Sequence, residues 1–224
     1  MSKTVEFFFD LGSPASYLAW TQLPGLCARQ GATLLYRPML LGGVFQATGN
    51  ASPAMIPAKG RYLFTDLARF AERYGVPFGL PPGFPLNTLM LMRGVIGTQL
   101  QHPERFEALL KALFTGMWGE RRNLGDAAVL QQTLEQAGFD IAAFSALAGD
   151  ALARKGLLEI LGRIVAVDSQ REHAWFEGPS GRQRARAISG LSQKLLMLLR
   201  ISRSVRRQWK QLDADEARQL QPWM

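Results

Sequence analysis

The chain has 224 residues, of which 47% are hydrophobic and 20% charged, a mixture suited to one folded domain with or without an inserted subdomain. This mixture excludes a disordered or fibrous protein, and the single cysteine, Cys27, excludes an internal disulfide and a two-thiol redox centre. The net charge of +8 is uneven, because residues 1–150 carry +1 and residues 151–224 carry +7.

The first 40 residues predict a strand, a helix and a second strand. Residues 5–10 form a short apolar and aromatic run typical of a buried strand. Ser13 is a favourable N-cap and Pro14 suits the first turn of a helix that reaches about Gln30. A second strand is expected over residues 33–38. This order predicts two parallel strands joined by a right-handed helical crossover.

The middle of the chain is expected to be helical. Residues 41–60 are rich in glycine, proline and small polar side chains, which predicts a long loop. A helix should follow over residues 60–74, and a proline-rich loop over 81–85. Further helices are predicted near residues 88–100, 103–117, 126–137 and 140–148. Helices in series after a strand–helix–strand unit indicate an insertion, since the α/β alternation does not continue.

The basic tail gives weaker patterns. Residues 164–168 and 173–176 could be two strands of a hairpin. Residues 191–205 could form a basic amphipathic helix with leucines on its apolar side.

The turn over residues 10–17 is a candidate for chemistry. It lies where a strand passes into a helix, and there free amides and the positive helix end attract an anion. In redox enzymes such a turn carries Cys-x-x-Cys, and the matching positions here are Ser13 and Ser16. Serine cannot exchange disulfides, but its hydroxyl can donate a hydrogen bond to another molecule's thiolate. From this turn alone, an ordinary helix cap is the simpler explanation of Ser13.

An ordered set of short motifs runs through the first 150 residues. They are Phe-Phe-Asp-x-x-Ser-Pro-x-Ser-Tyr at 8–17, Gly-Asn-x-x-Pro at 49–53, Pro-x-Lys-x-x-Tyr at 57–62, Asp-Leu-x-Arg at 66–69, Gly-Val-Pro-Phe at 75–78 and Phe-Pro-x-Asn-Thr at 84–88. In order and spacing they resemble the 2-hydroxychromene-2-carboxylate isomerases and kappa-class glutathione transferases. The resemblance implies an α/β, thioredoxin-like fold of the DsbA family with an all-helical insertion. Residues 1–40 would then be the thioredoxin-like unit, residues from about 55 to 150 the insertion, and 151–224 the rest of the domain.

The resemblance also implies site residues. Glutathione would bind at Ser13 and at the backbone beside Pro14, with Asn50 close to it, and Ser13 would be the catalytic group that holds the sulfur. Lys59 and Phe84 are the candidates for substrate binding. Plain alternatives stay open, since Asn50 could be a left-handed turn residue after Gly49, Lys59 a solvated charge and Phe84 a core side chain. No metal is expected.

As a function, the resemblance implies a glutathione-dependent isomerase of an aromatic or enone-like small molecule, in the catabolism of aromatic compounds. Residues 1–6 place an acid where a signal peptide would be apolar, so a cytoplasmic location is expected. A kappa-type transferase is one alternative. Another is a binding or scaffold protein that has lost catalysis, because two motifs of the family are missing after residue 150. These are a Gly-Val-Phe-Gly-x-Pro-Thr segment with a cis-proline, and Phe-x-Gly-x-Asp-Arg. Gly162-Arg163-Ile164 could stand in the place of the first, and residues 175–182 faintly echo the second.

Two explanations of this tail stay open. It could be a diverged hairpin and helix, or it could result from a changed reading frame or gene end. Its arginines invite a nucleic-acid role, but no known module is present and the aromatics are few, so we expect no nucleic-acid partner. No run approaches the roughly 18 apolar residues of a membrane span, so no membrane partner is expected either. The resemblance leaves a homodimer open.

Overall fold

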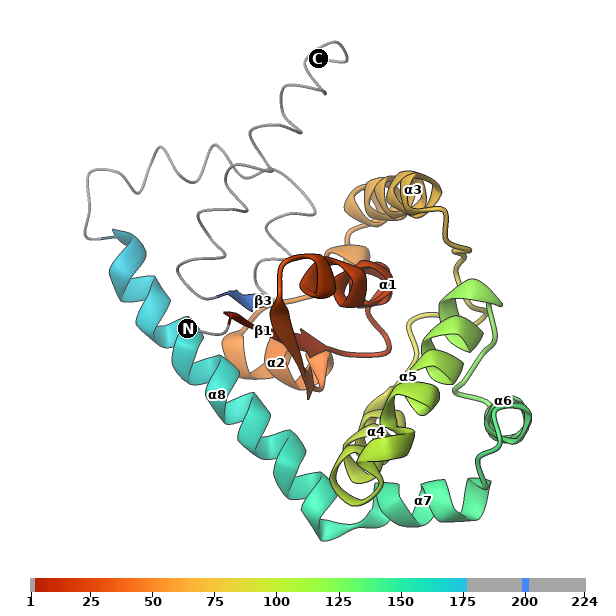
Figure 1. Ribbon diagram of the computed structural model, residues 1–224. Helices are drawn as coiled ribbons and strands as arrows, with labels where there is room; N and C mark the ends of the chain where they lie inside the picture. Colours follow the sequence, from red (N-terminus) through yellow and green to blue (C-terminus); the bar gives the residue numbers. More distant parts are fainter. Residues whose placement is uncertain (1–2, 177–198, 202–224) are drawn as a thin grey trace.

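The computed structural model describes residues 3–176 and 199–201, which form a small sheet surrounded by helices (Figure 1). The elements in chain order are β1 (Lys3–Phe9), α1 (Pro14–Arg29), β2 (Ala32–Pro38), α2 (Leu41–Thr48), a 3₁₀ turn (Pro53–Met55), α3 (Pro57–Tyr74), α4 (Leu89–Gln101), a 3₁₀ turn (Pro103–Arg105), α5 (Phe106–Phe114), a π-helix (Thr115–Gly119), α6 (Ala127–Gln136), α7 (Ile141–Gly149), α8 (Ala151–Phe176) and β3 (Leu199–Ile201).

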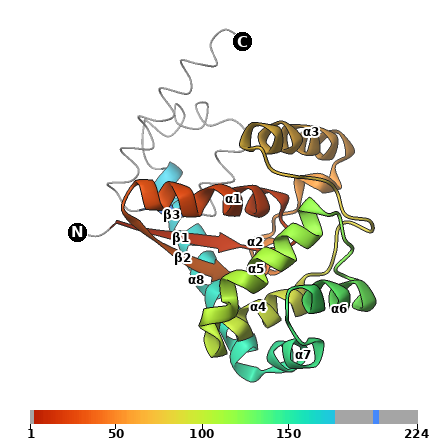
Figure 2. The same ribbon diagram turned by 45° about the vertical axis from the view of Figure 1, so that its right-hand side comes forward.

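The sheet has the strand order β2-β1-β3. Strands β1 and β2 are parallel, with Lys3 opposite Ala32 and Phe9 opposite Pro38, and α1 connects them. Strand β3 pairs antiparallel with the other edge of β1. Figure 2 shows α1 lying along these strands. The strand, helix and parallel strand expected from the first 40 residues are therefore confirmed.

Successive side chains of β1 point to opposite faces of the sheet, as in any pleated strand, and the two faces make different contacts. Phe7 and Phe9 are fully buried and stack with each other, and Phe9 also contacts Phe114 of α5. On the opposite side of the strand, Glu6 pairs with Arg163 of α8, whose guanidinium also lies 5.8 Å from the centre of the Phe8 ring. Thus α8 covers one face of the central strand and the aromatic core fills the other.

The prediction of a long loop over residues 41–60 is wrong for the first part of that range. Residues 41–48 form α2, which ends at Gly49 with a left-handed φ of 66°. A 3₁₀ turn follows at Pro53–Met55, and α3 begins at Pro57, three residues earlier than expected. The amide of Leu41 has no partner within α2 and donates a hydrogen bond to the distant carboxylate of Asp10. Helix α2 begins at Leu41 because this contact satisfies that amide. Composition alone does not reveal such a contact.

The predicted helices of the middle region are confirmed as α3, α4, α5, α6 and α7. Two glycines let α7 approach α4 closely. A Cβ on Gly94 would clash with the ring of Phe144, and a Cβ on Gly97 would lie 2.9 Å from the carbonyl oxygen of Leu147. Since the Leu147 obstacle is backbone, it cannot swing aside, and this crossing depends on Gly97.

The hairpin expected over residues 164–168 and 173–176 is wrong, because both segments lie within α8. Helical spacing on α8 buries Ala153 and Leu157, and Gly156 packs close to Ile96 of α4. One turn beyond Ile160, which packs on the core, Arg163 reaches Glu6. These contacts recur every three or four residues along the first half of α8, and the helix continues from them through both segments.

Two further expectations for the tail change with this helix. Gly162 and Arg163 lie inside α8, so they form no turn in the place of a cis-proline. Of the helix expected over residues 191–205, Leu199–Ile201 is instead strand β3, and the rest lies outside the described residues. The free edge of β1 offers unpaired backbone groups, and pairing there decides the conformation of this short segment.

The α4–α7 crossing gives a stability prediction. Gly97→Ala should lower the free energy of unfolding by about 1–3 kcal/mol, because the added methyl group overpacks the contact with Leu147. Gly162→Ala in α8 is the control, since its Cβ would meet nothing within 4 Å, and it should be neutral or stabilising by up to about 1 kcal/mol. Urea unfolding measures both. Equal midpoints for the two variants would contradict the packing described here.

Candidate functional site

Ser13 lies at the start of α1 as the N-cap, as expected. Its Oγ accepts a hydrogen bond from the amide of Ser16 at 3.2 Å, and its own amide donates to the carbonyl oxygen of Asp10 at 3.0 Å. The residue is 7% exposed. Because the Oγ is already an acceptor in the cap, the hydroxyl proton is left to donate. The geometry thus suits a hydrogen bond from Ser13 to an anion at the positive end of α1.

The carboxylate of Asp10 organises this turn. One oxygen, Oδ1, accepts from the amide of Gly12 and from the hydroxyl of Thr88, both at 2.8 Å. The other, Oδ2, accepts from the amide of Leu41 at 2.7 Å. Asp10 is 2% exposed, and burial raises the pKa of its carboxyl group although the three hydrogen bonds act in the opposite direction. The carboxylate therefore ties the turn to the starts of both α2 and α4.

Packing also fixes the turn. A Cβ at Gly12 would lie only 3.0 Å from the methyl group of Thr88, so the position favours glycine. The amide of Leu11 is directed at the sulfur of Met92, 3.3 Å away. The carbonyl oxygen of Leu11 accepts a hydrogen bond from the Trp118 indole at 2.8 Å. The backbone between Asp10 and Ser13 is thus held by α2, α4 and the π-helix together.

An aromatic group continues from Trp118 to Phe84. The Trp118 ring stacks with Phe78 at 5.9 Å between centroids and meets Phe84 edge-on at 5.6 Å. Tyr17 of α1 stacks with Phe78 and donates its hydroxyl hydrogen bond to the carbonyl oxygen of Pro77 at 2.7 Å. Phe84, which precedes a cis-proline, is therefore connected to the Ser13 turn through the Trp118 ring.

The other expected site residues lie as follows. Pro14 is partly buried in the first turn of α1. Asn50 is exposed and its amide nitrogen donates to the Thr48 hydroxyl at 3.0 Å. Lys59 is exposed near the start of α3. No hydrogen bond or ion pair within the described residues joins Asn50 or Lys59 to the Ser13 turn. The left-handed conformation considered for Asn50 is wrong, because Gly49 adopts it.

Sequence reasoning gave no role in this site to three residues that shape it, namely Asp10, Thr88 and Trp118, although Asp10 and Thr88 stand within the quoted motifs. A charged side chain that ends an apolar strand is a usable signal for Asp10, because a carboxylate is rarely buried without partners. The partners themselves could not be inferred, since Thr88 and Trp118 are 78 and 107 residues away from the positions that they contact.

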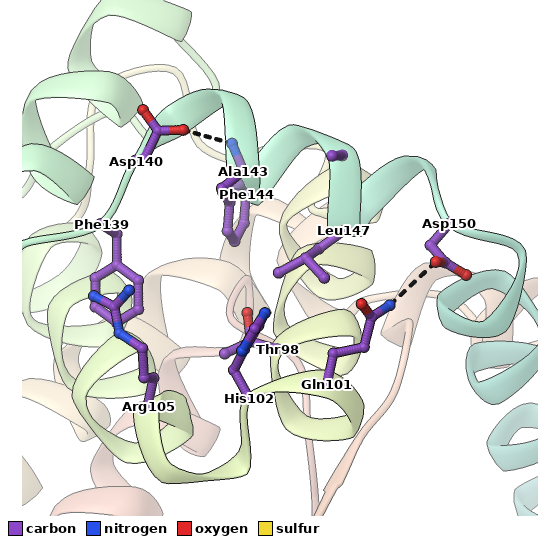
Figure 3. A pocket seen from close by; sticks show the side chains of 11 residues that line it. Thr98, Gln101, His102, Arg105, Phe139, Asp140, Ala143, Phe144, Leu147 and Asp150 are labelled. Carbon is purple, nitrogen blue, oxygen red and sulfur yellow. Dashed lines mark hydrogen bonds between the residues drawn. The ribbon is translucent and has the colours of Figure 1, made fainter.

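A separate cleft of about 350 Å³ lies between the C-terminal half of α4 and α7 (Figure 3). Its polar groups already have partners: Gln101 donates to Asp150, Asp140 caps α7 at Ala143, and Arg105 lies over the Phe139 ring and donates to Gly138. The cleft begins at Thr98, ten residues along α4 from Thr88, which is about 15 Å at the rise of an α-helix. It is not part of the Ser13 site.

Comparison with known families gives two matches. Residues 4–156 match the DSBA-like thioredoxin domain, and residues 108–224 match the Fusaric acid resistance protein family. The second match covers the basic tail and overlaps the first over residues 108–156. In the described part of the chain, no helix is long and apolar enough to cross a membrane. Nor do three or more His, Cys, Asp or Glu side chains gather there as metal ligands.

Individual relatives agree with the first match. A 2-hydroxychromene-2-carboxylate isomerase of Sphingobium xenophagum is 32% identical over 147 residues, which are 62% of this chain and 71% of that protein. Glutathione S-transferase kappa 1 of Homo sapiens is 28% identical over 143 residues, 62% of this chain and 63% of that protein. The chain thus matches less than two thirds of the length of the human transferase. The thioredoxin match itself ends at residue 156, near the start of the basic tail.

Solved structures support the same fold. The structure of a 2-hydroxychromene-2-carboxylate isomerase superimposes with a TM-score of 0.63 at 28% identity, over 73% of this chain and 79% of that one. A candidate protein disulfide isomerase from Nitrosomonas europaea, at 16% identity, superimposes with a TM-score of 0.55 over 75% of this chain and 80% of that one. The resemblance stated from the motifs and the thioredoxin-like fold with helical insertion are confirmed.

The buried Asp10 predicts how stability depends on pH. Its pKa is higher in the folded than in the unfolded chain, so the folded state binds the proton more tightly. Wild-type protein should therefore lose stability relative to Asp10→Asn as the pH rises from about 4 through the folded pKa. Urea unfolding of both proteins at several pH values measures this difference.

The matched control is Asp126→Asn at the exposed cap of α6, which removes one negative charge and keeps a capping side chain. A constant difference between wild type and Asp10→Asn across this pH range would contradict a raised pKa for Asp10.

Proposed function

Since the chain belongs to the DSBA-like thioredoxin domain family, we propose that it is a glutathione-dependent isomerase of the 2-hydroxychromene-2-carboxylate isomerase type. Its homologues are isomerases and glutathione transferases, which supports an enzyme of this family. The substrate would be an aromatic or enone-like small molecule. The observation that carries the proposal is Ser13, a buried N-cap in a turn held by three elements, with its hydroxyl proton left to donate.

The residues of this turn fit a thiolate ligand. The Ser13 hydroxyl would donate to the sulfur of glutathione, and the N-terminus of α1 would favour its negative charge. Glutathione supplies a nucleophile that adds reversibly to an electrophilic carbon of a conjugated substrate, which permits rotation about the former double bond. The turn is already fixed before any ligand binds, so little ordering is needed when the anion arrives.

For Asn50, Lys59 and Phe84 we propose the roles that the resemblance implies. Asn50 and the backbone beside Pro14 would hold the peptide part of glutathione. Lys59, exposed near the start of α3, would attract an acidic substrate group. Phe84, fixed edge-on against Trp118, would offer an apolar surface to an aromatic ring. We also propose a cytoplasmic location, a role in aromatic catabolism and no nucleic-acid or membrane partner, with a homodimer as the assembly to test.

A kappa-type glutathione transferase would use the same Ser13 chemistry, but the thioether bond between glutathione and the electrophilic substrate would remain in the product. A different candidate is a binding protein of the same fold without catalysis. One observation favours it, namely that α8 continues through Gly162 and Arg163, the place where the cis-proline turn of the family could stand. The match of residues 108–224 to the Fusaric acid resistance protein family also supports a tail unlike that of the isomerases.

Substitution of Ser13 tests the proposed chemistry. Ser13→Ala should lower kcat/KM with 2-hydroxychromene-2-carboxylate and glutathione by about 10- to 100-fold, because a hydrogen bond to a charged group contributes about 1.5–3 kcal/mol. Ser16→Ala is the matched control, since the Ser16 hydroxyl is buried without a hydrogen-bond partner among the described residues and its loss removes no bond. Unchanged turnover in Ser13→Ala would sink the role given to Ser13.

Calorimetry separates the enzyme from the binding protein. We expect glutathione to bind with a Kd between about 1 μM and 1 mM, or about −8 to −4 kcal/mol. S-methylglutathione cannot form a thiolate, so it should bind the wild-type protein more weakly than glutathione does. The two ligands should bind Ser13→Ala with about equal affinity. If neither ligand produced heat, the non-catalytic alternative would replace the enzyme.

A further inference from the structure

The indole of Trp118 reaches from the π-helix to the turn that carries Ser13. Its ring is fully buried, and Nε1 donates to the carbonyl oxygen of Leu11 at 2.8 Å. Trp118 lies 107 residues away in sequence from Leu11. π-Helical turns are rare and are often found at functional sites. This hydrogen bond joins the π-helix to the backbone two residues before Ser13.

The indole of Trp118 binds one end of a single peptide group. The carbonyl of Leu11 and the amide of Gly12 belong to the same planar unit, so they cannot turn independently. Trp118 binds the oxygen of this unit at 2.8 Å, and Asp10 Oδ1 binds its N–H, also at 2.8 Å. The peptide plane is therefore clamped at both ends. Ser13 follows Gly12 directly, so the orientation of this plane sets where α1 begins and where the Ser13 hydroxyl lies.

We propose that Trp118 is a positioning residue, whose indole N–H clamps the Leu11–Gly12 peptide and thereby aims the Ser13 hydroxyl at the sulfur of bound glutathione. This inference rests on the proposed function and assigns it a further residue. Without the N–H, the Leu11 carbonyl would lose its indole donor and the peptide plane could rotate about its remaining contact to Asp10.

The same ring also contacts the candidate substrate loop. The carbonyl oxygen of Trp118 accepts from the amide of Gly79 at 2.8 Å, and its ring contacts Phe78 and Phe84. Trp118 thus holds the Ser13 turn with its indole nitrogen and the Phe84 loop with its backbone and ring face. A shift of the indole would disturb the sulfur and the substrate surface together.

The test is a pH titration of the thiolate absorbance of bound glutathione. In Trp118→Phe the ring stays but the N–H is lost, and the pKa of bound glutathione should rise by about one unit toward the free value. The matched control is Tyr17→Phe, which also removes one ring-to-carbonyl hydrogen bond, at Pro77, from the same aromatic group. Tyr17→Phe should leave the pKa of bound glutathione within about 0.3 unit of the wild-type value. This margin is small enough to distinguish no change from a rise of about one unit.

Each outcome decides between the two proposals. If wild-type protein does not lower the glutathione pKa, the proposed function fails and this inference falls with it. If wild type lowers it and Trp118→Phe does so equally, only the inference is overturned. Equal rises in Trp118→Phe and Tyr17→Phe would also overturn it, because they indicate general loosening of the aromatic group.

A second variant keeps the proposal testable if Trp118→Phe does not fold. Thr88→Val removes one hydrogen bond from Asp10, the other end of the clamp, and leaves the Trp118 ring and its N–H in place. A rise in the pKa of bound glutathione in this variant would support the clamp. An unchanged pKa of bound glutathione would contradict the clamp, because the hold of Asp10 on the peptide would then not depend on its hydrogen bond from Thr88.

Discussion

The buried carboxylate of Asp10 is the interaction on which the site depends. Burying a carboxylate is costly unless every oxygen is hydrogen-bonded, and here three donors from separate parts of the chain converge on it. Gly12 comes from the turn itself, Leu41 begins α2 and Thr88 precedes α4. Loss of any one donor would leave a buried charge less well compensated, so the three segments are constrained to meet at one point.

This convergence explains why a loop can serve as a fixed site. The residues from Asp10 to Ser13 have no regular secondary structure, yet their backbone is bonded by Asp10, by Trp118 and by the cap of α1. A turn fixed in advance can direct a hydroxyl and a helix N-terminus at an anion without reorganising when it binds. Burial also raises the pKa of the Asp10 carboxyl group, so the same group links local stability to the geometry of the turn.

A second polar contact anchors the opposite face of the central strand. Glu6 accepts from Arg37 of β2 at 2.9 Å and from Arg163 of α8 at 3.0 Å. Burial alone would raise the pKa of Glu6, but these two guanidinium groups hold it below its usual value. The pairing joins α8 to the sheet on the face that the aromatic core does not use. Asp10 and Glu6 thus fix the same strand to different parts of the fold, one at its end and one at its middle.

The sequence by itself determined the strand–helix–strand start, Ser13 as the cap of α1 and most helices of the middle region, because periodicity, caps and glycine stops act within a few residues. Only the tertiary structure decided the rest. Helix α2 starts where a distant carboxylate binds Leu41, α8 stays helical because it packs on α4 and pairs with Glu6, and Leu199–Ile201 is a strand because β1 offers an edge. The positioning of Ser13 likewise depends on Trp118, and contacts between residues so far apart in the chain leave no local pattern to detect.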